Sequence, residues 1–224
     1  METVRGRRVG AIFQDPLTSL NPLFRVGDPL SETIRLHADL DKAQARARAK
    51  ELMREVGISA VEERIDSYLH QFSVGVLQRV VIALALCAEP ELIVADEATA
   101  ALDVSIRAEI TALFKRLCRE RGTAVLLGTH DMGAIAETAD RVTVMYAGRL
   151  AEMGAGDDVI RRPRHPETTG LMGSIPSLRK EVEQLQMIPG LMPRLDAPAG
   201  LSLQSAMCLC RAKVSDASAA DRLG

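Results

Sequence analysis

Two carboxylates directly follow an apolar segment near the middle of the chain. The run 92–95 reads Leu-Ile-Val-Ala and is followed by Asp96 and Glu97. A carboxylate at the end of a buried strand can hold Mg²⁺, directly or through water. A second carboxylate beside it can orient or deprotonate an attacking water. The pair is therefore a candidate site for metal-assisted attack by water, although a strand with a solvated acidic end would show the same pattern.

A second apolar run ends in a histidine. Residues 123–127 are followed by Gly128, Thr129, His130 and Asp131. In a parallel sheet both runs would end at the same edge, where ligands bind. His130 would then lie near Asp96 and Glu97 and could contact a terminal phosphate. A lone histidine after a strand is more often structural, but the paired arrangement favours a functional role.

A third candidate lies at the start of a predicted helix. Ser73 precedes the turn at Gly75, and an apolar stretch from Val80 to Ala88 follows. A serine at this position can cap the helix. The free amides and the dipole at a helix N-terminus favour an anion such as phosphate. Taken alone, the segment fits a plain helix cap equally well.

These candidates need a scaffold of strands and helices in alternation. Apolar runs without alternation predict buried strands at 8–13, 92–95 and 123–128. A two-strand hairpin is expected at 141–153, and 14–22 is expected to be a loop. Helices are predicted at about 29–38, 42–56, 60–66, 75–88 and 104–120. The pattern predicts an α/β fold with a mostly parallel sheet covered on both faces by helices.

The chain divides into a core and a tail. Residues 1–162 form the predicted core, which includes a helical subdomain at about 29–88. Prolines recur through 163–224, so this part is expected to be an irregular tail.

Composition narrows the possible classes of protein. Apolar residues make up 47% of the 224 residues and charged residues 26%, which is typical of a folded globular protein. The net charge of −2 gives no attraction toward nucleic acid. Cys87 and Cys118 lie in apolar or amphipathic patterns and are expected to be core residues, so no disulfide framework is predicted. The apolar run 80–88 is far shorter than the roughly 20 residues of a membrane span.

Several motifs, in this order, resemble the ATP-binding subunits of ABC transporters, within the dipeptide, oligopeptide and nickel importer branch. The matching segments are a glutamine loop (12–22), the end of Walker B (Asp96-Glu97), a D-loop (101–103), a switch histidine (129–131), the closing strands (140–149) and two tail motifs (164–168 and 188–190). The resemblance covers about residues 4–200. It implies a P-loop NTPase fold.

The resemblance also implies roles for individual residues. Gln14 would sense Mg²⁺ and the attacking water and link them to the membrane partner. Glu97 would be the general base, Asp96 would hold the metal, and His130 would stabilise the γ-phosphate of ATP.

Two further contacts would form between subunits. Asp103 would bridge two ATP-binding domains, and Ser73 and Gly75 would reach the phosphate held by the other subunit. The implied partners are transmembrane permease subunits and a second ATP-binding subunit, either a paralogue or a second copy. The implied location is peripheral, on the cytoplasmic face of the inner membrane.

The sequence departs from the family pattern in three places. It contains no G-x-x-x-x-G-K-[ST] phosphate loop, so we expect an incomplete, N-terminally truncated ATPase that does not bind ATP well alone. Val74 stands where the signature has glycine, which predicts weaker contact with phosphate. Cys208 and Cys210 fall short of the four thiolates of an iron–sulfur site.

Two alternative functions can be compared with these observations, and the second fits them poorly. A non-catalytic interaction protein would retain the 14–27 loop and the helical segment 29–88, and would dock on a permease or on a complete paralogue. An ABC-type ATPase of DNA repair would need a long coiled coil and a basic stripe, and the sequence contains neither.

Overall fold

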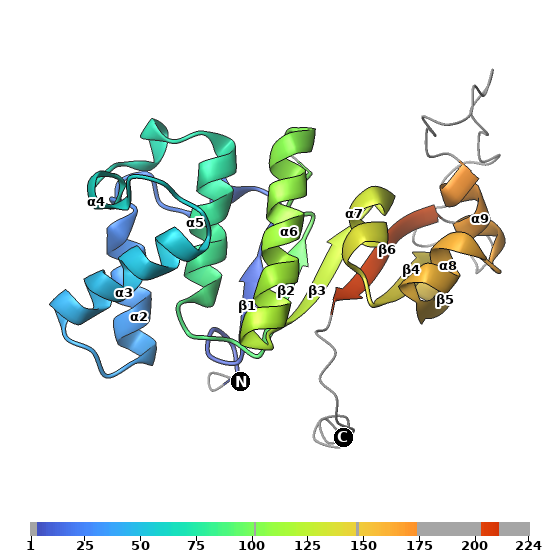
Figure 1. Ribbon diagram of the computed structural model, residues 1–224, viewed down its shortest axis with the longest axis horizontal. Helices are drawn as coiled ribbons and strands as arrows, with labels where there is room; N and C mark the ends of the chain where they lie inside the picture. The colour runs from blue at the N-terminus through green and yellow to red at the C-terminus, as the bar shows by residue number, and fades with distance from the viewer. Residues whose placement is uncertain (1–3, 101, 147, 174–202, 211–224) are drawn as a thin grey trace.

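The computed structural model describes residues 4–100, 102–146, 148–173 and 203–210 (Figure 1). One six-stranded sheet runs through the molecule in the order β1-β2-β3-β6-β4-β5. The strand bounds are β1 Val9–Ile12, β2 Leu92–Asp96, β3 Ala124–Thr129, β4 Arg141–Tyr146, β5 Arg149–Ala155 and β6 Leu203–Cys210. Strands β1, β2 and β3 pair in parallel, whereas the pairs that involve β6 and β5 are antiparallel. The sheet is therefore parallel in the half that carries the candidate residues.

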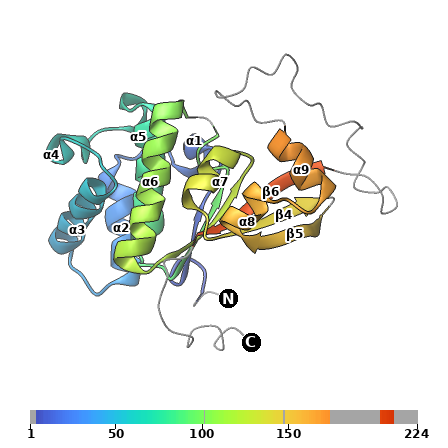
Figure 2. The same cartoon turned by 45° about the vertical axis from the view of Figure 1, so that its right-hand side comes forward.

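The helices lie in two groups. Helices α2 to α5 gather beyond the β1 edge (Figures 1 and 2), and α6 lies in front of β1 and β2 in the view of Figure 1 and contacts β3. The helix bounds are α1 Pro16–Ser19, α2 Gly27–His37, α3 Lys42–Glu55, α4 Val61–Arg64, the 3-10 helix η1 Leu69–Gln71, α5 Val74–Leu86, α6 Val104–Arg121, α7 Met132–Thr138, α8 Gly156–Arg161 and α9 Pro166–Gly173. The first group falls within residues 27–86, where the sequence analysis places a helical subdomain at about 29–88.

Local sequence explains where several helices begin and end. Asp41 caps α3 with its side chain, and Gln44 reaches back to the Asp41 amide to complete a capping box. Helix α6 ends at Gly122, whose φ of 68° is left-handed and suits glycine. The segment predicted as a loop contains α1, because Asp15 accepts a hydrogen bond from the Leu17 amide and Pro16 follows it as the first helical residue.

The strands bury alternate residues rather than every residue. In β2, Ile93 and Ala95 are fully buried, whereas Leu92 and Val94 are only partly buried. Strand β3 shows the same alternation. In these two strands one face of the sheet is therefore covered more completely than the other.

One hydrophobic core joins the sheet, α6 and the helical subdomain. Its largest fully buried side chains come from all three parts: Ile12, Leu30, Ile34, Leu52, Met53, Ile65, Ile82, Leu86, Ile93, Ile110, Phe114 and Leu117. Cys87 and Cys118 are buried, as predicted. Burial raises the pKa of the Cys87 thiol to about 12, so this cysteine is held as the neutral thiol.

The C-terminal region is more regular than predicted. Helices α8 and α9 extend past the hairpin, and β6 lies between β3 and β4. Residues 174–202 and 211–224, with the second tail motif at 188–190, lie outside the described residues. Strand β6 carries Cys208 and Cys210 at sheet positions opposite Leu127 and Val125.

Candidate functional site

The candidate site is assembled at the carboxyl ends of β1, β2 and β3. Parallel pairing aligns these three strands, so the residues that follow them meet at one edge. Gln14 follows β1, Glu97 follows β2 and His130 follows β3. The edge predicted from the sequence is therefore present, with all three residues on it.

Glu97 is the centre of this cluster. Its Oε2 accepts a hydrogen bond from Gln14 Nε2 at 2.6 Å, and its Oε1 lies 3.0 Å from His130 Nδ1. The Glu97 amide donates to the Gly128 carbonyl at 2.8 Å, which fixes the start of the loop after β2. Glu97 has a left-handed φ of 45°, which is uncommon for a residue with a side chain and persists only where the surrounding structure holds it.

Asp96 lies at the end of β2 beside Gly128 of β3. The two residues are paired in register, and a Cβ on Gly128 would lie 3.3 Å from Asp96 Oδ1. Since glycine provides no side chain there, the exposed Asp96 carboxylate is not covered from that direction. Within the described residues there is no cluster of three or more His, Cys, Asp or Glu that could hold a metal ion unaided.

Ser73 and Gly75 lie at the beginning of α5. This helix ends close to the start of β2, so its N-terminus is directed toward the same edge as the carboxyl ends of the strands. Ser73 is the N-cap residue, but its side chain makes no capping hydrogen bond, contrary to the expected cap. Gly75 packs against Ile106 of α6, and a Cβ on Gly75 would lie 3.0 Å from that side chain.

Asp103 begins α6 without a side-chain cap and is exposed. No hydrogen bond joins Ser73, Gly75 or Asp103 to Glu97 among the interactions of the described residues. The structure therefore joins Gln14, Glu97 and His130 by hydrogen bonds. Ser73 and Asp103 are exposed and Gly75 packs against α6, and none of the three is bonded to this group.

One polar contact at this edge has no sequence motif. Arg107 in the first turns of α6 donates to Asp131, directly after His130, at 2.8 Å. An arginine in an amphipathic helix gives no signal by itself, and its partner lies 24 residues away. Only the fold brings the two side chains together.

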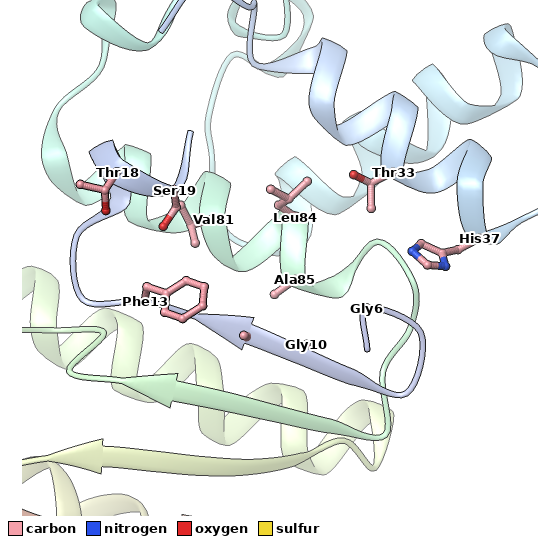
Figure 3. Close-up of a pocket in the computed structure, with 11 residues that line it drawn as sticks. Gly6, Gly10, Phe13, Thr18, Ser19, Thr33, His37, Val81, Leu84 and Ala85 are labelled. Carbon is pink, nitrogen blue, oxygen red and sulfur yellow. The ribbon is translucent and has the colours of Figure 1, made fainter. Parts of the chain in front are cut away.

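A cavity of about 350 Å³ lies beside this cluster, between β1, α1, α2 and α5. Figure 3 shows Phe13 at the end of β1 below Thr18 and Ser19 of α1, with Thr33 and His37 at the far end. Gln14, Glu97 and His130 are not among its lining residues. The cavity is therefore a neighbour of the polar cluster and not part of it.

Comparisons with known proteins give the family of the chain. The family model described as ABC transporter matches residues 1–100, and the model described as oligopeptide/dipeptide transporter, C-terminal region, matches residues 151–201. The chain belongs to the ABC transporter family. The second match places it with the peptide-transporter members.

The curated relatives of this ABC protein carry matching names. It is 48% identical over 88% of its length to the oligopeptide transport ATP-binding protein OppD of Bacillus subtilis, and 45% identical over 96% to the dipeptide transport ATP-binding protein DppD of the same organism. It spans 56% of the first and 64% of the second.

Solved structures support the same fold. CbiO1 from Clostridium perfringens, part of the transporter complex cbiONQ, matches with a TM-score of 0.64 at 29% identity, over 72% of this chain and 62% of that one. The ATP-binding cassette MJ0796, in a dimeric post-hydrolysis state bound to ADP and Pi, matches with a TM-score of 0.61 at 27% identity, over 69% and 65% of the two chains. The fold of this chain is therefore that of an ABC ATPase cassette.

Proposed function

We propose that this chain is an ATP-hydrolysing subunit of an ABC importer for peptides. The observation that supports this most directly is the hydrogen-bonded cluster of Gln14, Glu97 and His130 at the carboxyl edge of the parallel strands. The names of its relatives support oligopeptides or dipeptides as the transported class.

Each member of the cluster has a distinct role in this proposal. Glu97 orients and deprotonates the attacking water, because its carboxylate is held from both sides by Gln14 and His130. His130, whose side chain is 68% exposed, contacts the γ-phosphate of ATP. Gln14 joins Glu97 to the loop that contains α1, so the state of the site is transmitted to that loop.

The residues at the site fit Mg²⁺ as the cofactor. Asp96 offers a carboxylate that Gly128 leaves uncovered, and Gln14 has its amide oxygen left once its nitrogen is bonded to Glu97. Magnesium takes one or two protein oxygens and completes its shell with water and substrate phosphates. The ion, when bound, would neutralise charge on the phosphate oxygens.

The described residues offer no lysine to hold the triphosphate at this edge. Lys42 begins α3, Lys50 is paired with Glu62, and Lys115 donates to the Glu137 carbonyl. In our proposal a second ATP-binding subunit therefore takes part. Ser73 and Gly75 contact the phosphate bound by that subunit, and Asp103 contributes to the interface.

The neighbouring cavity supports a membrane partner. Leu17 of α1 and the following Leu23 and Phe24 are more than half exposed, and they lie near Phe13 in sequence on the loop that starts at Gln14. In our proposal an apolar segment of a permease docks here, which places the chain peripherally on the cytoplasmic face of the membrane. Among the described helices none is long and apolar enough to cross a bilayer.

The test measures Mg-ATP turnover by the chain alone, by a complete peptide-importer ATPase such as the Bacillus subtilis dipeptide relative, and by their mixture. We expect the mixture to turn over ATP faster than the relative alone, because Ser73 completes a site in the other subunit. Ser73→Ala should abolish the increase, whereas Ser31→Ala, a matched change on α2, should retain it. No increase in turnover would contradict the proposal.

A second candidate is a non-catalytic docking protein. The exposed apolar residues near the cavity support it, because docking does not require a phosphate loop. Calorimetric titration of the Glu97→Gln variant with Mg-ATP separates the two candidate functions, because this substitution blocks turnover. Co-purification with a permease, without ATP binding or any effect on a partner ATPase, would favour docking alone.

A further inference from the structure

Arg107 lies between the two loops that follow β2 and β3. Its Nη1 donates to Asp131 Oδ2 at 2.8 Å, and its Nη2 donates to the Leu102 carbonyl at 3.3 Å. Leu102 immediately precedes Asp103, and Asp131 immediately follows His130. One guanidinium group therefore connects the loop of Asp103 to the loop of His130.

Asp131 also determines the shape of the loop after β3. Its Oδ1 accepts hydrogen bonds from the Gly133 and Ala134 amides and so caps α7. Its own amide donates to Thr129 Oγ1, and Thr129 is buried. His130 lies between Thr129 and Asp131, and hydrogen bonds hold both of these residues. The position of Asp131 therefore determines the position of His130.

The Arg107–Asp131 pair is partly shielded from water. The two side chains are 32% and 22% exposed. Partial burial acts to raise the pKa of Asp131, but the hydrogen bond from Arg107 and those from the Ala134 and Gly133 amides hold that pKa below its usual range. The aspartate is therefore ionised at neutral pH and stays paired with Arg107.

We propose that Arg107 is a positioning residue that sets the place of His130 relative to Asp103 by bonding to Asp131 and to the Leu102 carbonyl. The use of His130 in this inference rests on the proposed function, whereas the geometry around Arg107 does not. Arginine suits this position because its planar group can donate in two directions at once, which an ammonium on a flexible chain does less well.

The structure supplies a matched control for packing between α6 and α7. Lys115, two turns further along α6, donates to the Glu137 carbonyl near the end of α7 at 2.9 Å. Lys115→Ala removes a contact between the same two helices without touching the loop of His130. A general loosening of α6 against α7 would affect both variants alike, whereas a positioning role concerns Arg107 alone.

The experiment follows the histidine ring signals of the whole chain by NMR, without nucleotide. The protein has four histidines, and His130→Gln assigns the signal of interest. We expect Arg107→Ala to move the His130 signals and to leave those of His37 and His70 in place. Arg107→Lys should restore part of the shift, and Lys115→Ala should leave His130 unchanged.

A double-mutant cycle tests the route through Asp131. Asn still caps a helix, so Asp131→Asn removes the charge while it keeps the start of α7. In the Asp131→Asn background, Arg107→Ala should move the His130 signals by less than half as much as in the wild type.

Three outcomes would overturn the proposal: unchanged His130 signals in a folded Arg107→Ala protein, an equal shift from Lys115→Ala, or full additivity in the cycle. All three readouts are independent of ATP. A failure of the proposed ATPase function would therefore be recognised separately in the turnover assay.

Discussion

The left-handed backbone at Glu97 leads to the prediction that glycine stabilises the protein more than alanine at this position. Replacing Glu97 by Ala or by Gly removes the same hydrogen bonds to Gln14 and His130, so their loss cancels when the two variants are compared. What remains is the response of the backbone to φ 45°. We expect Glu97→Gly to be more stable than Glu97→Ala.

The magnitude follows from two opposing effects. A residue with a Cβ in the left-handed region costs about 1–2 kcal/mol. Glycine avoids that cost but loses roughly 0.5–1 kcal/mol through its greater freedom in the unfolded chain. The Gly variant should therefore have a free energy of unfolding about 0.75 kcal/mol above that of the Ala variant, which is the difference between the midpoints of the two ranges.

Urea unfolding followed by circular dichroism measures the difference. Ala60 has a φ of 49° and is exposed, so Ala60→Gly should also stabilise the protein. Ala112, exposed in the interior of α6, is the opposite control, and Ala112→Gly should cost about 1 kcal/mol. The reasoning is refuted if Glu97→Gly is no more stable than Glu97→Ala while the two controls behave as stated.

Two further variants test the scaffold and the site. Gly27→Ala should lower the free energy of unfolding by about 1–3 kcal/mol in urea titrations, because its Cβ would lie 2.5 Å from Ile65 Cγ1 and 2.8 Å from the Ile65 carbonyl oxygen; Ser31→Ala on the same helix should change little. Because the pKa of Asp131 is lowered in the folded protein, its carboxylate stabilises the fold fully above the pKa it has in the unfolded chain. This stabilisation is lost as the pH falls through the pKa of Asp131 in the folded protein. Between pH 5 and pH 3 the urea midpoint should therefore fall further for the wild type than for Asp131→Asn. An equal fall in the two proteins would contradict this.

Local signals in the sequence were sufficient for most of the elements. The helices predicted at 42–56 and 104–120 correspond closely to α3 and α6, and Gly122 marks the end of α6. Helix α1 was missed because a helix of one turn depends on a single cap at Asp15, which resembles loop chemistry. Strand β6 was missed because its partners β3 and β4 are distant in sequence and no local pattern identifies them.

Asp96, Glu97 and His130 were identified from the sequence because each follows an apolar run, and parallel strands bring such positions to one edge. Gln14 was identified from the resemblance to the family. The contacts among these residues were decided by tertiary structure. Gln14 lies 83 residues from Glu97, and His130 lies 33 residues from it, so their hydrogen bonds depend on the order and register of β1, β2 and β3. Arg107 gained its place at the site in the same way, since only the packing of α6 over the sheet brings its guanidinium to Asp131.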